Sequence, residues 1–133
     1  MVVENSGKVH VLVVDDDKAI RDVLKIFLGL EGGLLYSSVE TVDQAIDFVE
    51  HNNPDVVVTD YNLSDMNGIE LFRHVNGEMG KKIPFIIITG DDKKDIGLTP
   101  VNGINVYFLQ KGIGNFFEEL ISLIERAALG ADS

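Results

Sequence analysis

The amino-acid sequence predicts a single α/β domain built on an open, doubly wound parallel sheet of five strands with helices on both faces. Five short apolar runs alternate with amphipathic stretches along the chain. Three of these runs are apolar almost throughout, as strands are when helices bury both of their faces. A length of 133 residues suits one domain. Together these observations favour the doubly wound arrangement.

The five predicted strands are rich in β-branched and aromatic residues. We expect them at residues 9–14, 34–39, 55–59, 84–89 and 105–110.

Helical spacing of apolar residues predicts the first two helices. The first pattern covers 20–28 and the second covers 42–49. Thr41 and Gln44 have the spacing of a capping box, so the second helix should begin there.

The remaining connections differ from one another. Helices are predicted at 68–77 and at 113–128. The connection between them, 91–103, contains Gly97 and Pro100, which interrupt a helix. We therefore expect at most a short or irregular helix in this fourth connection.

Composition narrows the possible locations and partners. Asp and Glu number 22 against 11 Lys and Arg, a formal charge of −11, which disfavours direct binding to nucleic acid. Cys is absent, and no apolar run is long enough to span a membrane. We expect a cytoplasmic domain at 8–128, with flexible ends at 1–7 and 129–133.

The residues capable of chemistry follow the predicted strands. Strand one is followed by three consecutive carboxylates, 15–17, and strand three by Asp60. Strand four ends in Thr89, and strand five leads into Lys111. Ligands of doubly wound sheets bind beyond the carboxyl ends of the strands. All these side chains should therefore share one crevice.

Clustered carboxylates repel one another and require a cation. At about 4 Å and an effective dielectric near 20 the repulsion is roughly 4 kcal/mol per pair. Asp17 directly precedes a helical pattern and is predicted to cap it, which leaves Asp15 and Asp16 as metal ligands. Carboxylate oxygens without thiolates favour Mg²⁺, or Mn²⁺ in its place.

The remaining groups suit phosphoryl chemistry. Asp60 stands alone on its strand and can act as a nucleophile toward phosphorus. Lys111 can pair with a phosphoryl oxygen, and the hydroxyl of Thr89 can donate a hydrogen bond to another.

Four sequence motifs occur at the ends of the first, third, fourth and fifth predicted strands. They are "LVVDD" (12–16), "VVVTDYNLSDMNG" (56–68), "IIITG" (86–90) and "FLQK" (108–111). Over about 9–128 the chain resembles receiver domains of two-component response regulators, including the single-domain chemotaxis regulator. The resemblance implies a flavodoxin-like fold with strand order 2-1-3-4-5.

The resemblance also implies a role for each matching residue. By the resemblance, Asp60 is the phospho-acceptor. The metal ligands are Asp15, Asp16, Asp60 and the backbone carbonyl of Asn62. Thr89 and Lys111 contact the phosphoryl group. Such a domain takes phosphate from a histidine kinase or histidine phosphotransfer protein, catalyses only its own phosphorylation and dephosphorylation, and signals to a downstream protein or to an effector in the same chain.

The chain departs from the family pattern at several positions. Phe108, three residues before Lys111, stands at the family's switch aromatic but lacks a hydroxyl, and Tyr107 is the alternative. Gly112 replaces a Pro that commonly follows the lysine in a cis bond, which leaves the geometry of the Lys111–Gly112 peptide open. Ser64 likewise stands where Pro is common.

Two other classes of function remain open. A haloacid dehalogenase-like phosphatase would use Asp15 as nucleophile, Asp17 as general acid and 91–92 as metal ligands, but Asp60 and Lys111 would then have no role. A receiver-like binding module that is never phosphorylated would form no covalent adduct with a small phosphodonor.

Overall fold

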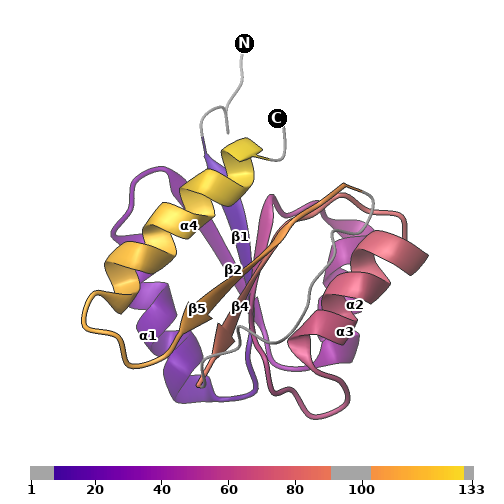
Figure 1. Cartoon of the computed structure of the whole chain (residues 1–133), viewed down its shortest axis with the longest axis horizontal. Helices are drawn as coiled ribbons and strands as arrows, with labels where there is room; N and C mark the ends of the chain where they lie inside the picture. The colour runs from indigo at the N-terminus through magenta and orange to yellow at the C-terminus, as the bar shows by residue number, and fades with distance from the viewer. Residues whose placement is uncertain (1–7, 91–102, 131–133) are drawn as a thin grey trace.

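The computed structural model describes residues 8–90 and 103–130, and in this part of the chain five parallel strands form one sheet in the order β2-β1-β3-β4-β5. The strands are β1 (Val9–Val14), β2 (Leu34–Val39), β3 (Val56–Asp60), β4 (Phe85–Thr89) and β5 (Val106–Gln110). The helices are α1 (Lys18–Gly29), α2 (Val42–His51), α3 (Gly68–Arg73), the π-helix η1 (His74–Glu78) and α4 (Phe116–Gly130). Figure 1 shows the whole chain.

The predicted fold class and strand order are confirmed. The first two strands have the predicted bounds, and the other three begin one residue later than expected. The short or irregular helix expected in the fourth connection lies outside the described residues. In the described part of the chain, no helix combines the length and the apolar character needed to cross a membrane.

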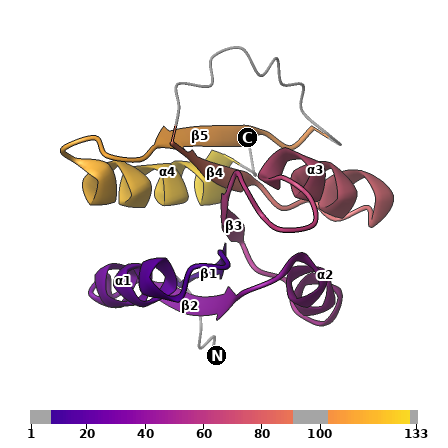
Figure 2. The same cartoon turned by 90° about the horizontal axis from the view of Figure 1, so that it is seen from below.

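Helices cover the sheet on both faces, α1 and α4 on one and α2 and α3 on the other (Figure 2). Successive β1 side chains alternate between these layers, since Val11 and Val13 pack under α1 and α4 while Leu12 and Val14 pack under α2 and α3. All four are fully buried. This two-sided burial explains why the strand has no polar alternation in its sequence.

Side-chain caps fix where the helices begin. Asp17 accepts the amide N–H of Ala19 at 2.9 Å and caps α1, as predicted. Thr41 and Gln44 form the predicted capping box of α2. Asn67 caps α3 through a further capping box with Glu70. Each cap ties a strand-to-helix loop to its helix close to the carboxyl end of a strand.

The helix predicted at 68–77 changes type after Arg73. It is α-helical to that residue and then forms one π-helical segment, η1. The buried side chain of Asn76 hydrogen-bonds this segment to the chain before β4. Its amide N–H groups donate to the carbonyls of Phe72 at 3.2 Å and Ile83 at 2.9 Å, and its amide oxygen accepts the Ile83 N–H at 2.7 Å. These hydrogen bonds hold the backbone of Ile83, two residues before β4, in place.

The last helix is displaced relative to its prediction at 113–128. It begins at Phe116, after a turn in which the Phe116 N–H bonds the Ile113 carbonyl at 3.2 Å, and it runs to Gly130. The Lys111–Gly112 peptide before that turn is trans, since the described residues contain no cis bond. Gly112 has φ +83°, a left-handed conformation that glycine adopts without strain.

Candidate functional site

The carboxyl ends of β1 and β3 place two carboxylates side by side. In the parallel ladder Val14 pairs with Thr59, so the next residues, Asp15 and Asp60, lie level on adjacent central strands. Asp15 is 3% exposed. Burial raises the pKa of the Asp15 carboxyl, the negative charges of Asp60 and Asp16 raise it further, and a hydrogen bond from the backbone N–H of Asp17 opposes this rise.

Lys111 brings a positive charge to the same edge of the sheet. Its Nζ lies 3.5 Å from Oδ1 of Asp60, whose side chain is 13% exposed. Its backbone N–H donates to the carbonyl of Thr89 at 2.8 Å, which joins the ends of β5 and β4. Thr89 is itself buried at the end of β4. Four strand ends therefore meet at this edge, as predicted.

The chain after Asp60 is held close to the sheet. Tyr61 donates its N–H to the Ile88 carbonyl and accepts the Gly68 N–H, each at 2.8 Å. A Cβ at Gly68 would lie 3.0 Å from the Asp60 carbonyl oxygen and 3.1 Å from a methyl of Thr59, closer than most Cβ contacts, so glycine at the first residue of α3 allows this approach without a shift of its neighbours. The position of Asp60 is thereby fixed from both sides.

The loop side chains lie farther toward solvent. Asp16 is exposed, and the hydroxyl of Ser64 donates to its Oδ2 at a long 3.5 Å. Asn62 is exposed in the loop after β3 and forms an isolated bridge with Asn67. Asp17 is also exposed, but its side chain caps α1, so Asp16 is the exposed member of the acidic run that does not cap the helix.

Sequence reasoning missed Arg21. Its Nη1 donates to the backbone carbonyl of Asp15 at 2.7 Å, and its own carbonyl accepts the hydroxyl of Tyr36 at 2.9 Å. The signal was its place one turn into α1, because long helical side chains lean back toward the amino end, here toward Asp15. Arg21 thus holds the backbone of the acidic loop.

The two candidate switch aromatics point to opposite faces of the sheet. Phe108 pairs with Ile87 in the β4–β5 ladder, so it faces the same side as Thr89, two residues along. Tyr107 faces α4, where it packs against the core and the Arg126 guanidinium lies 5.8 Å from its ring centroid. Only Phe108 shares a face with Thr89.

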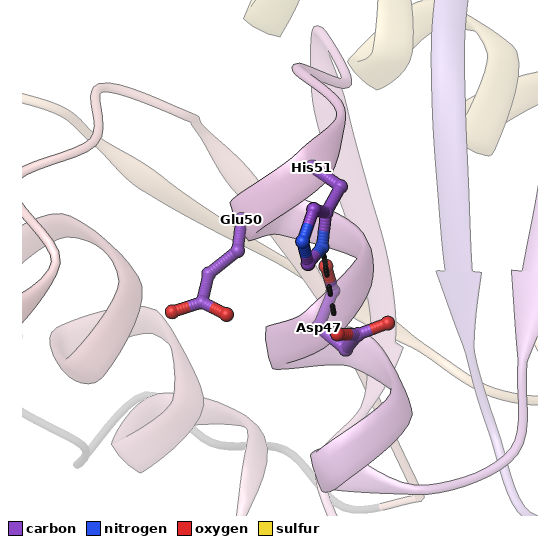
Figure 3. Close-up of side chains that lie close together, drawn as sticks. All are labelled: Asp47, Glu50 and His51. Atoms are coloured by element: carbon purple, nitrogen blue, oxygen red, sulfur yellow. Dashed lines mark hydrogen bonds and ion pairs between the residues drawn. The ribbon is translucent and has the colours of Figure 1, made fainter.

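Within residues 8–90 and 103–130, one group of acidic and histidine ligand atoms lies within 4.8 Å of one another, and it is Asp47, Glu50 and His51 on α2 (Figure 3). All three are exposed. A hydrogen bond to the Asp47 carbonyl and the nearby carboxylate raise the pKa of His51, as in an ordinary surface pair one helical turn apart. This group is not the predicted metal site.

The predicted metal ligands are spaced more widely than that group, but their chemistry suits Mg²⁺. Asp15, Asp16 and Asp60 offer only carboxylate oxygens, and the raised pKa of buried Asp15 reflects an environment in which a nearby cation would be stabilising. The residues 91–92, which the phosphatase alternative requires, lie outside the described residues.

Comparison with known proteins identifies the family. A sequence model described as "Response regulator receiver domain" matches residues 11–125, and the chain therefore belongs to this family of signalling domains.

Curated relatives are longer proteins. The chain is 34% identical to the two-component response regulator ORR27 of Oryza sativa subsp. japonica over 78% of its own length and 17% of that protein. It is 31% identical to the DNA-binding transcriptional regulator NtrC of Proteus hauseri over 90% of its length and 24% of that protein. The chain thus spans about a quarter or less of either relative.

Solved structures share the fold. The receiver domain of the Francisella response regulator 1452 superposes with a TM-score of 0.76 at 24% identity, covering 92% of this chain and 98% of that one. The response regulator domain of Thermotoga maritima CheB gives 0.76 at 22% identity, covering 92% and 97%.

Proposed function

We propose that this domain is a phosphorylation-activated switch of a two-component system, with Asp60 as its phospho-acceptor and residues 8–128 as the functional unit. The observation that carries the proposal is the position of Asp60 at the end of a central strand, level with Asp15 and 3.5 Å from the Lys111 ammonium. Family membership supports it. Each element of this arrangement serves a reaction at phosphorus.

The reaction forms one bond and breaks one. A carboxylate oxygen of Asp60 attacks phosphorus, the bond from phosphorus to the donor's leaving atom breaks, and an acyl phosphate results. Lys111 then pairs with a phosphoryl oxygen, and the Thr89 hydroxyl donates to another. The places of both residues at adjacent strand ends support these roles.

Asp15, Asp16, Asp60 and the backbone carbonyl of Asn62 would hold Mg²⁺ or Mn²⁺. When bound, the ion neutralises charge on the entering phosphoryl group. The Arg21 hydrogen bond to the Asp15 carbonyl holds the loop in place for this set of ligands.

The phosphodonor we propose is a histidine kinase or a histidine phosphotransfer protein in the cytoplasm. Phe108 is the proposed switch aromatic, because it lies on the face of the sheet that Thr89 also faces. The output passes to a downstream protein or to an effector in the same polypeptide.

Intact-mass spectrometry with acetyl phosphate and Mg²⁺ tests the proposal. We expect a single phosphoryl adduct on the wild type, none on Asp60→Asn, and a normal adduct on Asp65→Asn, an exposed aspartate in the same loop. A beryllofluoride complex should follow the same pattern.

Two results would contradict the proposal. An adduct that persists in Asp60→Asn and disappears in Asp15→Asn would support the phosphatase alternative. Absence of any adduct or beryllofluoride complex on the folded wild type would support the binding module that is never phosphorylated.

A further inference from the structure

Several apolar side chains are exposed along the line where α1 and α4 meet, which we call the seam. On α1, Phe27 is 41% exposed and Leu30, at its end, is 75% exposed, while Leu129 on α4 is 72% exposed. Phe27 stacks on Phe117 of α4 with ring centroids 3.9 Å apart. Single exposed apolar residues are ordinary, but a continuous set marks an interaction surface.

Two cavities along the seam form one groove. The first, of about 390 Å³, lies over the Phe27–Phe117 stack, and the second, of about 330 Å³, continues to Leu129. They share Glu31 and Ile121 in their lining. Along α4 the groove runs from Phe117 to Leu129, about 18 Å, the length of a helix of roughly 12 residues.

Most of the groove lies away from the phosphoryl site, and only Phe117, at its near end, also lines a neighbouring cavity that includes Lys111. Its lower part is lined by Val9 and Gly33, at the amino ends of β1 and β2. Asp60 lies at the carboxyl end of the sheet. An occupant of the part of the groove near Val9 and Leu129 therefore contacts a surface that the transfer chemistry does not use.

All the charge on the lining of the two cavities is negative. Their ionisable lining residues are Glu31, Glu118 and Glu125, and all three are exposed. Arg126, the cation of α4, lies instead over Tyr107. The groove thus combines an apolar floor with an acidic rim.

We propose that this seam groove is a docking site for a basic amphipathic helix of a partner protein. An apolar stripe on such a helix fills the floor, and its lysine and arginine side chains pair with the glutamates of the rim. A second copy of this chain fits less well, because a two-fold interface brings the same acidic rim against itself. The net charge of −11 adds to that repulsion.

The test uses the full chain, unphosphorylated, and a synthetic helical peptide of Leu and Lys about 18 residues long, with Leu at i, i+3, i+4 and i+7. Chemical shifts of the ¹⁵N-labelled protein should change at Leu30, Phe117 and Leu129 on titration. The same peptide with Glu in place of Lys, and a scrambled peptide of the same composition, should bind much more weakly.

Matched variants separate local contact from general charge attraction. Leu30→Ser and Leu129→Ser, both at exposed positions, should each raise the peptide Kd about tenfold. Glu118→Lys should raise it about fivefold. Glu50→Lys on α2, on the other face of the sheet, changes the net charge equally and should change the Kd less than about twofold.

Three outcomes would overturn the proposal. Glu50→Lys could weaken binding as much as Glu118→Lys, which would mean that attraction is not local. Both leucine variants could bind with wild-type affinity while their thermal unfolding is unchanged. Sedimentation could reveal a dimer that Leu30→Ser dissociates, which would assign the groove to a second copy.

Discussion

A carboxylate buried beside other carboxylates costs folding free energy. Asp15 is such a group, because its burial, Asp60 and Asp16 all raise its pKa. At neutral pH the group is ionised in the unfolded chain, so a raised pKa in the folded state means that folding disfavours its charge. The fold keeps this carboxylate at the site despite that cost.

Substituting Asp15→Asn should therefore stabilise the folded domain while impairing metal binding. In the presence of a chelator at neutral pH, we expect the free energy of unfolding to rise by about 1 kcal/mol, because the buried charge is removed and the amide oxygen can still accept the Asp17 N–H. Urea unfolding measures the change. Asp16→Asn, at an exposed position, is the control and should stay within about 0.5 kcal/mol.

A lower stability of Asp15→Asn under chelating conditions would contradict this expectation. It would mean that the hydrogen bond from Asp17 outweighs the cost of burial at this position.

At the scale of one element, a tertiary contact of Asn76 joins η1 to the chain before β4. The amide group of Asn76 makes three hydrogen bonds, one within the helix and two to the backbone of Ile83 before β4. Without that side chain, a buried N–H and a buried carbonyl of Ile83 lose their partner. Unsatisfied buried polar groups cost about 1–3 kcal/mol each.

We expect Asn76→Ala to lower the free energy of unfolding by about 3 kcal/mol. The matched control is Asn52→Ala, since the exposed amide of Asn52 bonds only the Phe48 carbonyl one turn back, and it should cost less than about 1 kcal/mol. Urea unfolding of both variants checks the difference. Equal losses in the two variants would show that burial of the Asn76 amide is not decisive.

The elements show what the sequence could and could not predict. Continuous apolar runs such as 56–58 were sufficient to predict buried parallel strands, and strand ends were sufficient to bring Asp15 and Asp60 together. The spacing of apolar residues did not distinguish the π-helical segment from the α-helix before it, and the contact of its Asn76 with Ile83 is a tertiary one that this spacing does not show. The capping box at Asn67 had a readable sequence signal that was overlooked.

The candidate site was likewise predictable in part from the sequence. Asp60 and Lys111 could be paired because parallel strands end at one edge, and the structure places them 3.5 Å apart. The Arg21 hydrogen bond to Asp15 depends on the direction of one side chain, which periodicity does not encode. The roles assigned to these residues rest on chemistry and remain predictions.

At the scale of the whole molecule, charge opposes compaction. The chain carries 22 acidic residues against 11 Lys and Arg. The Lys18–Asp22 pair on α1 is largely exposed and contributes little. The folded domain therefore bears a self-repulsion that dissolved ions can screen over about 10 Å.

Adding monovalent salt should stabilise the domain. Between about 10 mM and about 200 mM NaCl we expect the free energy of unfolding to rise by about 1 kcal/mol, because screening weakens repulsion more in the compact state. Urea unfolding at both salt concentrations, repeated with KCl to exclude an ion-specific effect, measures the rise. Stability that falls as salt is added would show that attractive ion pairs dominate instead.

The backbone hydrogen bonds that anchor Tyr61 beside Asp60 have a practical consequence for fluorescence measurements. The chain contains no Trp and three Tyr, so its ultraviolet emission comes from tyrosine alone. One of these fluorophores adjoins Asp60 and is anchored by its backbone to Ile88 and Gly68, while Tyr107 lies across the sheet beneath Arg126. The domain thus carries an intrinsic chromophore one peptide unit from the group expected to react, and we expect phosphorylation of Asp60 to change its emission, which stopped-flow fluorimetry of unlabelled protein measures.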